Sequence, residues 1–431
     1  MFKKTKSLLV AAVALMMLFT SVAAFGAQLN DEGALVAPGE SSPVEAAITK
    51  TLRFPMGTIT PSATFNFLAT KISVDGNSTT DDLAKMPTLN TGNMTVSYIA
   101  ADTGTNNTET NIVSVIKETD DIFAGVTFPH AGIYVYEITE IADTNLAIDD
   151  NAPDEILTYS EAKYTLTVYV ANNEAGTGTY IMGLGTRATW DDSGEAAGDN
   201  KVDPTPGGNG EDYHFSQMIF VNDYVKTNTV IDPGADSTLS VGKTVTGDFA
   251  SREQYFDFEI SLTIPILVAD TPEYYKAYIV ENGAVVSPAN NANSALIGTE
   301  DGVSYIKIAS TGNTDFSLKH GQSLVFVDTP VGTRYVVEEQ MAPNYIPSVI
   351  VTTNAVQGEN VTGTISSALS TDIQLVGELL NSANFTNNRD SVTPTGLNLN
   401  DLPFIGLIAL GAGSLLFFVV AKSRRRNAEA Q

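Results

Sequence analysis

The chain of 431 residues has no cysteine, three histidines and one tryptophan. Without cysteine no disulfide can reinforce the fold, so any covalent staple must use other chemistry. The histidines stand in no zinc-binding or Ser-His-Asp motif, and the sequence has neither a glycine-rich phosphate loop nor EF-hand spacing. The acidic pair Asp191 and Asp192 is interpreted as solvated loop charge rather than a calcium site. The sequence therefore predicts no metal, no cofactor and no turnover enzyme.

Basic residues are also scarce. The chain has 23 Lys and Arg against 50 Asp and Glu, which gives a formal net charge of -27. Binding to a phosphate backbone needs clustered lysine and arginine. Nucleic acid is therefore excluded as a partner, and the acidity is interpreted as a solvated, self-repelling exterior.

The N-terminus has the layout of a secretory signal peptide. Three lysines among the first six residues precede an apolar run, Leu8–Phe19, and small residues follow at 22–27. A membrane anchor is the alternative interpretation, but the apolar run is short for a bilayer crossing. We expect residues 1–27 to be removed and the rest of the chain to be exported.

A second apolar run stands near the C-terminus. Leu402–Ala421 carries no charge and is long enough, at about 1.5 Å per residue, to cross a hydrocarbon core of about 30 Å. Lys422 and the arginines at 424–426 follow it, and such a cluster stays on the cytoplasmic side. The sequence therefore predicts a membrane span over 402–421, with everything before it outside the cell.

Between these ends the chain has the pattern of an all-β protein. Short alternating segments rich in Thr, Val, Tyr, Asn and Gly predict strands, and turn-forming residues at 227–236 predict a linker between two β-sandwich domains. Trp190–Asp212 is rich in Gly, Asp and Asn and is expected to be a long surface loop. The predicted order is signal peptide 1–27, leader 28–45, first domain 46–226, linker 227–236, second domain 237–390 and C-terminal signal 391–431.

The two halves share an ordered set of short motifs. Each begins with a strand that carries one lysine. A Phe-x-Phe strand, a Gly-led aromatic strand that ends in Glu, and a closing strand with Phe-x-Asn then follow. The motifs are Ile48–Leu52, Phe65–Phe67, Gly132–Glu140 and Phe220–Asn222 in the first half, and Val241–Val245, Phe256–Phe258, Gly332–Glu339 and Phe385–Asn387 in the second.

Strand parity places one lysine, one glutamate and one asparagine of each half on an apolar face, because side chains two residues apart share a face. Lys50, for example, lies with Ile48 and Leu52. The six residues are Lys50, Glu140 and Asn222 in the first half and Lys243, Glu339 and Asn387 in the second. Burying an unpaired charge costs several kcal/mol, so this repetition calls for a chemical reason.

A buried Lys, Glu and Asn can form a covalent cross-link. Desolvation lowers the pKa of lysine and raises the pKa of glutamic acid, so both can be neutral. A neutral amine is a nucleophile, and a protonated carboxylic acid can hydrogen-bond the Asn carbonyl and shuttle protons. Attack of the lysine Nζ on the asparagine Cγ, with loss of ammonia, would leave an amide between the first and last strands of each domain. The alternative is a pair of buried Lys–Glu ion pairs, each with a hydrogen-bonding Asn.

Taken together, these motifs resemble the backbone pilins of the streptococcal type, which are built from tandem pilin isopeptide-linkage domains. The resemblance implies two tandem Ig-like (CnaB-like) β-sandwiches. It also implies two Lys–Asn isopeptide bonds, each with a glutamate as proton shuttle. These are Lys50–Asn222 with Glu140, and Lys243–Asn387 with Glu339.

The C-terminus resembles the sorting signal that sortases read. Pro394, Thr395 and Gly396 precede the apolar run and the basic end, although Val392-Thr393 stands where Leu-Pro is usual. The resemblance implies that a sortase cleaves between Thr395 and Gly396 and joins Thr395 to a lysine of the next subunit. Lys201 is the candidate acceptor, and a solvated loop lysine is the alternative. An ordinary tail-anchored ectodomain is the alternative for the whole C-terminal signal.

The resemblance implies a structural function. We expect a shaft subunit that sortase joins to other pilin subunits and attaches to peptidoglycan at the surface of a Gram-positive cell. The second hypothesis is a monomeric wall-anchored adhesin that binds a host or matrix ligand.

Overall fold

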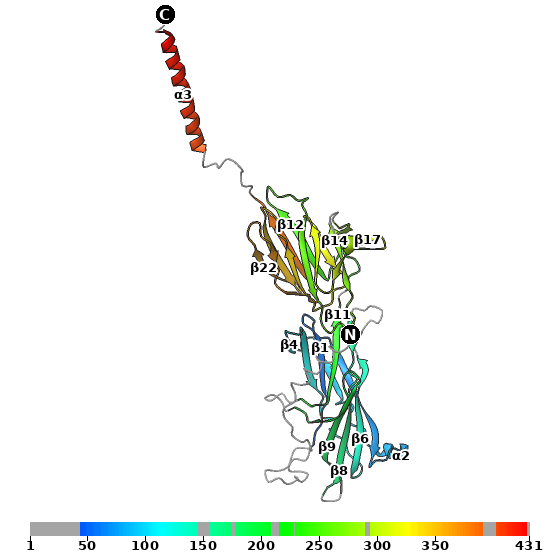
Figure 1. Cartoon of the computed structure of the whole chain (residues 1–431). Helices are drawn as coiled ribbons and strands as arrows, with labels where there is room; N and C mark the ends of the chain where they lie inside the picture. Colours follow the sequence, from blue (N-terminus) through cyan, green and yellow to red (C-terminus); the bar gives the residue numbers. More distant parts are fainter. Residues whose placement is uncertain are drawn as a thin grey trace, which may run out of the picture.

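The computed structural model describes residues 44–144, 155–173, 177–207, 215–227, 229–288, 294–390 and 402–428. These residues form two β-sandwiches stacked end to end, and a C-terminal helix, α3 (Leu402–Ala428) (Figure 1). The prediction of two tandem β-sandwiches is thereby confirmed. The predicted signal peptide (1–27), nearly all of the leader (28–45) and the sorting motif at 394–396 lie outside the described residues.

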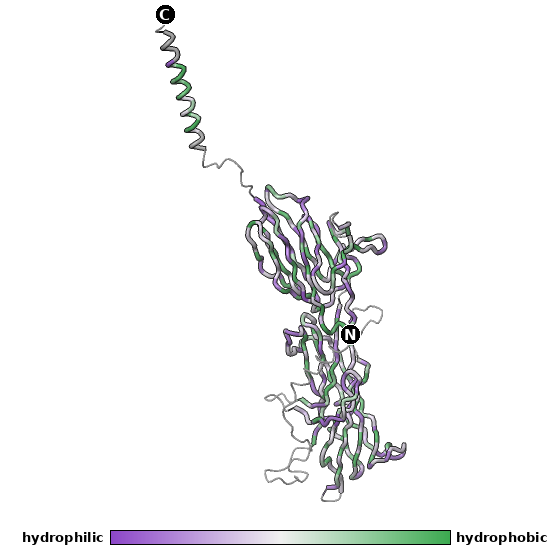
Figure 2. The backbone as a smooth tube through the Cα atoms, viewed as in Figure 1, coloured by the Kyte–Doolittle hydropathy of each residue, from purple (hydrophilic) through white to green (hydrophobic). Residues whose placement is uncertain are grey.

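Alternation of apolar and polar residues explains why these segments are strands. In β8 (Lys163–Asn172) every second residue from Tyr164 to Val170 is buried, and the residues between them are partly exposed. A period of two buries a single face only in an extended strand. Figure 2 shows hydrophobic and hydrophilic residues interleaved along the strands of both sandwiches.

The first sandwich consists of a five-stranded sheet, in the order β4-β5-β1-β11-β7, and a six-stranded sheet, in the order β10-β9-β8-β6-β2-β3. A short helix, α2 (Thr80–Lys85), follows β2. The strands other than β8 are β1 (Thr49–Pro55), β2 (Ala63–Val74), β3 (Thr95–Tyr98), β4 (Thr105–Asn107), β5 (Ile112–Glu118), β6 (Gly132–Thr144), β7 (Glu155–Thr158), β9 (Thr179–Trp190), β10 (Ala196–Val202) and β11 (Ile219–Lys226).

The second sandwich has a larger sheet in the order β16-β17-β14-β19-β12-β25-β21-β22, with β15 paired to β14. Its smaller sheet has the order β18-β13-β20-β23, with β24 paired to β20, and a 3-10 turn, η2 (Ser294–Leu296), precedes β16. The strands are β12 (Leu239–Thr246), β13 (Phe256–Thr263), β14 (Tyr274–Glu281), β15 (Ala284–Val286), β16 (Ile297–Glu300), β17 (Val303–Ala309), β18 (Asn313–Leu318), β19 (Gln322–Phe326), β20 (Arg334–Glu339), β21 (Ile346–Thr353), β22 (Val356–Thr362), β23 (Leu369–Ser370), β24 (Gln374–Leu375) and β25 (Ser382–Asn388).

The two sandwiches repeat one pairing scheme. The lysine strand pairs in parallel with the closing strand, β1 with β11 and β12 with β25. The register sets each lysine opposite the phenylalanine of the closing motif, and each glutamate opposite the second phenylalanine of Phe-x-Phe. These pairs are Lys50–Phe220, Lys243–Phe385, Phe67–Glu140 and Phe258–Glu339. The repeat in sequence is therefore also a repeat in register.

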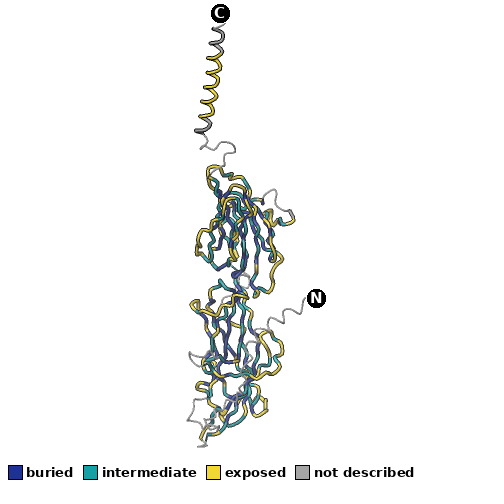
Figure 3. Tube along the Cα trace, turned by 60° about the vertical axis from the view of Figure 1, so that its left-hand side comes forward, coloured by how far each residue is buried: buried dark blue, intermediate teal, exposed yellow. Residues whose placement is uncertain are grey.

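Each sandwich has its own hydrophobic core, and Figure 3 shows buried chain running along the middle of both units. One aromatic contact recurs in the two cores. The ring centroids of Phe67 and Phe220 lie 5.0 Å apart, and those of Phe258 and Phe385 lie 5.3 Å apart. These pairs join the Phe-x-Phe strand of one sheet to the closing strand of the other, which fixes how the two sheets face each other.

The segment Trp190–Asp212 is not wholly the loop that its composition predicts. Within it β10 pairs antiparallel with β9, and Lys201 lies opposite Arg187. The register shifts between Ala196 and Asn200, as in a bulged strand at the edge of a sheet. An exposed edge strand needs no apolar alternation, so the hydrophobic pattern could not reveal it.

Direct hydrogen bonds join the two sandwiches. The Asn111 side-chain amide donates to the Gly332 carbonyl at 2.6 Å, and Asn111 is buried. The Glu378 carboxylate of the second unit accepts from the Ile59 N–H at 2.6 Å and from the Lys226 Nζ at 2.9 Å. Backbone and side-chain contacts together therefore hold the end of one unit against the start of the next.

The C-terminal helix α3 includes the apolar run seen in the sequence. Within the described part of the chain, no helix is both long enough and apolar enough to cross a membrane. The membrane span expected over 402–421 therefore stays a prediction from the sequence.

We expect Gly332→Ala to loosen the joint between the sandwiches. Gly332 has a φ of 86°, and a Cβ there would lie 2.3 Å from the Pro55 Cβ of the other unit. The matched control is Gly302→Ala, with a φ of 81° and no heavy atom within 4 Å. Gly332→Ala should destabilise the protein by about 1–3 kcal/mol more than the control. Thermal unfolding followed by calorimetry measures the difference. Equal losses of stability in the two variants would contradict close contact between the sandwiches at Gly332.

Candidate functional site

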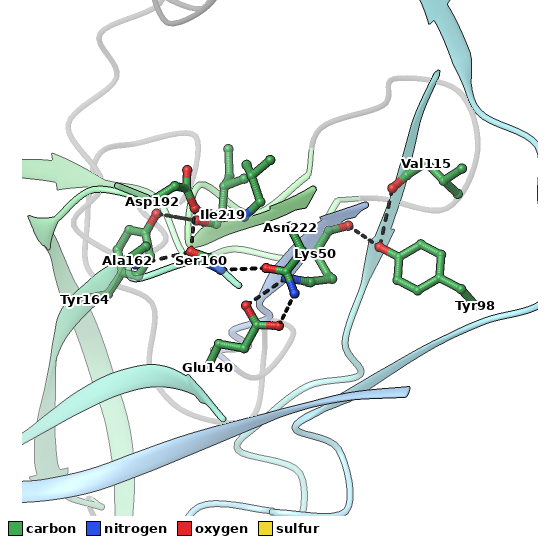
Figure 4. A network of polar contacts seen from close by, with 11 residues as sticks. Lys50, Tyr98, Val115, Glu140, Ser160, Ala162, Tyr164, Asp192, Ile219 and Asn222 are labelled. Carbon is green, nitrogen blue, oxygen red and sulfur yellow. Dashed lines mark hydrogen bonds and ion pairs between the residues drawn. The ribbon is translucent and has the colours of Figure 1, made fainter. Parts of the chain in front are cut away.

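The first sandwich holds a buried cluster of one lysine, one glutamate and one asparagine. The Lys50 Nζ donates to Glu140 Oε2 at 2.8 Å, and the Asn222 Nδ2 donates to Glu140 Oε1 at 2.8 Å (Figure 4). The side chains of Lys50 and Glu140 are 0% and 1% exposed, and Asn222 is 0% exposed. One carboxylate therefore bridges an amine and an amide whose side chains are fully buried.

The strand pairing explains how these three side chains meet. β1 and β11 are parallel neighbours, with Lys50 opposite Phe220 and Leu52 opposite Asn222. Lys50 and Asn222 therefore lie two positions apart on adjacent strands and on the same inner face. Glu140 reaches them from β6 of the other sheet. The site thus spans the core and contacts both layers of the sandwich.

The second sandwich holds the same three residue types in the equivalent register. The Lys243 Nζ donates to Glu339 Oε1 at 2.6 Å, and the Asn387 Nδ2 donates to the same oxygen at 2.7 Å. The side chains of Lys243 and Glu339 are 0% and 1% exposed. The structure therefore brings together all six residues that the sequence singled out, three in each unit.

Aromatic rings surround both amines. The Lys50 Nζ lies 4.7 Å from the centroid of Phe65, and the Lys243 Nζ lies 4.2 Å from the centroid of Phe256. Both phenylalanines are the first of their Phe-x-Phe motifs. These rings exclude water, and the cation–π attraction they offer is worth only about 2 kcal/mol when desolvated. The glutamate is therefore the main partner of each amine.

Burial shifts the protonation of both pairs toward the neutral forms. Desolvation lowers the pKa of Lys50 and of Lys243 from 10.5 to about 8, although the neighbouring glutamates oppose the shift. Desolvation also raises the pKa of Glu140 and of Glu339, against the effect of the lysines. Transfer of one proton from the amine to the carboxylate gives a neutral nucleophile beside a carboxylic acid.

The orientation of the Asn222 amide differs from the expectation that the glutamic acid holds the Asn carbonyl. The Ser160 backbone N–H donates to Asn222 Oδ1 at 2.7 Å. A backbone N–H can only donate, so the oxygen faces Ser160 and the nitrogen faces Glu140. In this cluster the carboxylate therefore contacts the amine that attacks and the nitrogen that leaves.

The sequence does not reveal the role of Ser160 or of Asp192. Asp192 is an exposed loop residue, as predicted, but its carboxylate also makes specific hydrogen bonds. Asp192 Oδ1 accepts from the Ser160 Oγ at 2.5 Å (Figure 4). The same oxygen accepts from the Val221 N–H at 2.8 Å. Among the described residues no group of acidic and histidine side chains is arranged to hold a metal ion. No local pattern links Ser160 or Asp192 to Asn222, because loops before β8 and after β9 bring them to β11.

The remaining residues that the sequence predicts for a site, Lys201 and Pro394–Gly396, are not part of the buried clusters. Lys201 is exposed on the edge strand β10. Pro394, Thr395 and Gly396 lie outside the described residues, so the sorting motif stays a prediction from the sequence.

Comparison with known proteins agrees with this geometry. Residues 46–225 match the family described as Spy0128-like isopeptide containing domain, and residues 237–389 match a family described only as a domain of unknown function. The chain is 26% identical over 410 residues to a pilin of Streptococcus pyogenes serotype M1, an alignment that covers 92% of this chain and 97% of that pilin.

Two weaker similarities accompany that match. The pilus tip adhesin Cpa of Streptococcus pyogenes is 28% identical over 189 residues, which is 44% of this chain and 22% of the adhesin. The crystal structure of the major pilin from Streptococcus pyogenes aligns with 81% of this chain and 100% of that chain, at 21% identity and a TM-score of 0.29. A TM-score of this size does not by itself establish a common fold.

The tandem β-sandwiches and the isopeptide-domain match define a structural protein of the cell surface. The match over residues 46–225 and the alignment with a pilin over 92% of this chain support a backbone pilin of the streptococcal type.

The lowered pKa of Lys243 predicts a pH dependence in an Asn387→Ala variant, which cannot form a cross-link. Between about pH 8 and pH 10.5 the unfolded chain of this variant binds more protons than the folded chain. The free energy of unfolding of the second unit should therefore rise with pH through this window, by about 1–3 kcal/mol. Below about pH 8 this contribution is constant. Urea unfolding midpoints measured between about pH 8 and pH 10 check this rise.

The control for this measurement is the double variant Asn387→Ala with Lys243→Met, which lacks the amine and should lack the rise. The titration of Glu339 affects stability at lower pH and in the opposite direction. Its raised pKa makes stability fall as pH rises from 4.5 through the folded value. The same pH profile in both variants would contradict a depressed pKa for Lys243.

Proposed function

We propose that the shaft subunit staples each of its two domains with an isopeptide bond, Lys50–Asn222 in the first and Lys243–Asn387 in the second. The observation that carries the proposal is the duplicated buried cluster, in which one glutamate contacts both the amine and the amide. Buried ion pairs alone rarely stabilise a core, because desolvation offsets their attraction. A reaction that consumes both charges removes that cost.

The proposed bonds join the first and last strands of each domain. A force applied along a pilus enters each domain near one end of the chain and leaves it near the other. With β1 bonded to β11, and β12 to β25, the load passes through a covalent link rather than through the hydrogen bonds of the sheet. In a chain without cysteine this staple takes the place of a disulfide.

We propose further that a sortase assembles the pilus. Cleavage between Thr395 and Gly396 would free a threonine carbonyl, and its transfer to Lys201 of another subunit would extend a homopolymer that ends on peptidoglycan. The support is the Pro394–Gly396 motif with the apolar run and basic end that follow it. The exposed position of Lys201 on β10 is compatible with this role.

A monomeric adhesin is the second candidate. The chain spans only 22% of the tip adhesin it resembles, but 97% of the pilin. Both domains also repeat the same cluster, so the described chain contains no third unit set apart for a ligand. These observations favour the shaft.

The staples predict a specific mass for a recombinant protein covering residues 28–390. Each bond releases one ammonia, so the intact mass should fall about 34 Da below the sequence mass, at about 17 Da per bond. Glu140→Ala and Glu339→Ala should each restore about 17 Da, because each removes the group that moves the proton. Intact-protein mass spectrometry checks both statements.

The matched controls are Glu137→Ala and Glu338→Ala, which alter glutamates on the same strands but outside the clusters. They should retain the full deficit. A mass equal to that of the plain sequence in the unsubstituted protein would mean that the clusters are ion pairs only.

Assembly predicts a second result, in cells that carry the sortase. Lys201→Arg should abolish the ladder of covalent multimers in boiled wall extracts, because arginine keeps the charge but is not a nucleophile for acyl transfer. Lys307→Arg, a lysine of the second domain, is the control and should leave the ladder intact. An unchanged ladder in Lys201→Arg would assign the acceptor to another lysine. A wall-bound monomer in the unsubstituted strain would favour the adhesin.

A further inference from the structure

The two clusters differ in what holds the asparagine carbonyl. In the first domain the Ser160 backbone N–H donates to Asn222 Oδ1 at 2.7 Å, in a buried position. Within the part of the second domain that the structure describes, Asn387 Oδ1 and Glu339 Oε2 have no hydrogen-bond partner. The same three residue types therefore have different hydrogen-bonding surroundings in the two domains.

Asp192 fixes the position of the Ser160 N–H. Its Oδ1 accepts from the Ser160 Oγ at 2.5 Å and from the N–H of Val221, the residue before Asn222, at 2.8 Å. Its backbone carbonyl accepts from the Glu161 N–H at 3.1 Å. One residue thus ties the Ser160 loop to the strand that carries the reacting amide, as Figure 4 shows for the side-chain contacts.

We infer that the Ser160 N–H is an oxyanion-hole donor for cross-linking in the first domain and that Asp192 is its positioning residue. The inference rests on the proposed function. Preorganised donors at 2.7–3.1 Å from a developing oxyanion are a major source of rate acceleration, because they need not reorganise as charge appears. The observed contact of 2.7 Å falls in this range.

The reaction balances with the groups in place. The lone pair of the neutral Lys50 Nζ attacks Asn222 Cγ, and the carbonyl π electrons move to Oδ1, where the Ser160 N–H stabilises the negative charge. Glu140 Oε2 accepts a proton from Nζ, and the acid proton on Oε1 passes to Nδ2. The carbonyl re-forms, the Cγ–Nδ2 bond breaks, and ammonia leaves. Glu140 ends as the carboxylic acid that it was at the start.

The test replaces only the N–H of Ser160. Cell-free translation of the full chain with the α-hydroxy analogue of serine at position 160 gives an ester in place of this amide. Samples quenched in denaturant at intervals and digested give the fraction cross-linked in each domain by mass spectrometry. The Lys50–Asn222 bond should form about 100-fold more slowly or worse. The Lys243–Asn387 bond, measured in the same molecules, should keep its rate.

Asp192 variants test the positioning role independently of the ester variant, which could fold poorly. Asp192→Ala should slow the first bond, whereas Asp192→Asn keeps an acceptor for Ser160 and Val221 and should restore most of the rate. Thermal unfolding in a Lys50→Met background, where no first bond can form, separates loss of folding from loss of rate.

Each outcome bears on a different claim. An ester variant that is folded and cross-links its first domain at the unsubstituted rate overturns the inference alone. Equal slowing of both domains also overturns it, because the second carbonyl lacks this donor. If the unsubstituted protein forms no Lys50–Asn222 bond, the proposed function fails and the inference fails with it.

Discussion

The burial of one lysine amine between two β-sheets is the constraint on which each domain of this chain depends. A charged amine in an apolar core is tolerated only beside an opposite charge with further hydrogen bonds, and Glu140 and Glu339 supply both in their domains. The glutamate must come from the opposite sheet, since the lysine strand and the asparagine strand are already neighbours. The geometry of the site therefore depends on how the two sheets pack. The Phe67–Phe220 and Phe258–Phe385 contacts hold that packing in place.

The register of two parallel strands places the buried lysine and the asparagine on the same inner face. With Lys50 opposite Phe220, the amide of Asn222 lies two residues along on the same face, and the second domain repeats this offset with Lys243 and Asn387. A slip of one residue would turn the lysine to the other face of its sheet. The proposed cross-link therefore requires a folded domain. If it forms, a load along the stacked domains would meet covalent links within them, and the Asn111–Gly332 hydrogen bond between them.

Much of this arrangement could be predicted from the sequence, because strand parity is a local property. The alternation around Lys50 and Lys243 places both on inner faces, and the structure buries both side chains completely. The ordered repeat likewise predicts which glutamate and which asparagine accompany each lysine. The edge strand β10 could not be predicted in this way, because it is exposed and polar. Its strand character comes from pairing with β9, which lies outside any local window.

Local sequence is enough to predict the two sandwiches, the six clustered residues and the absence of any disulfide, since periodicity and composition act over a few neighbouring residues. The orientation of the amides and the groups around them depend instead on tertiary packing. Ser160 reaches Asn222, and Asp192 reaches the neighbouring Val221, from loops distant in sequence, whereas Asn387 has no such donor among the described residues. The direction of a hydrogen bond depends on where three separate segments meet, and no pattern within one segment carries that information.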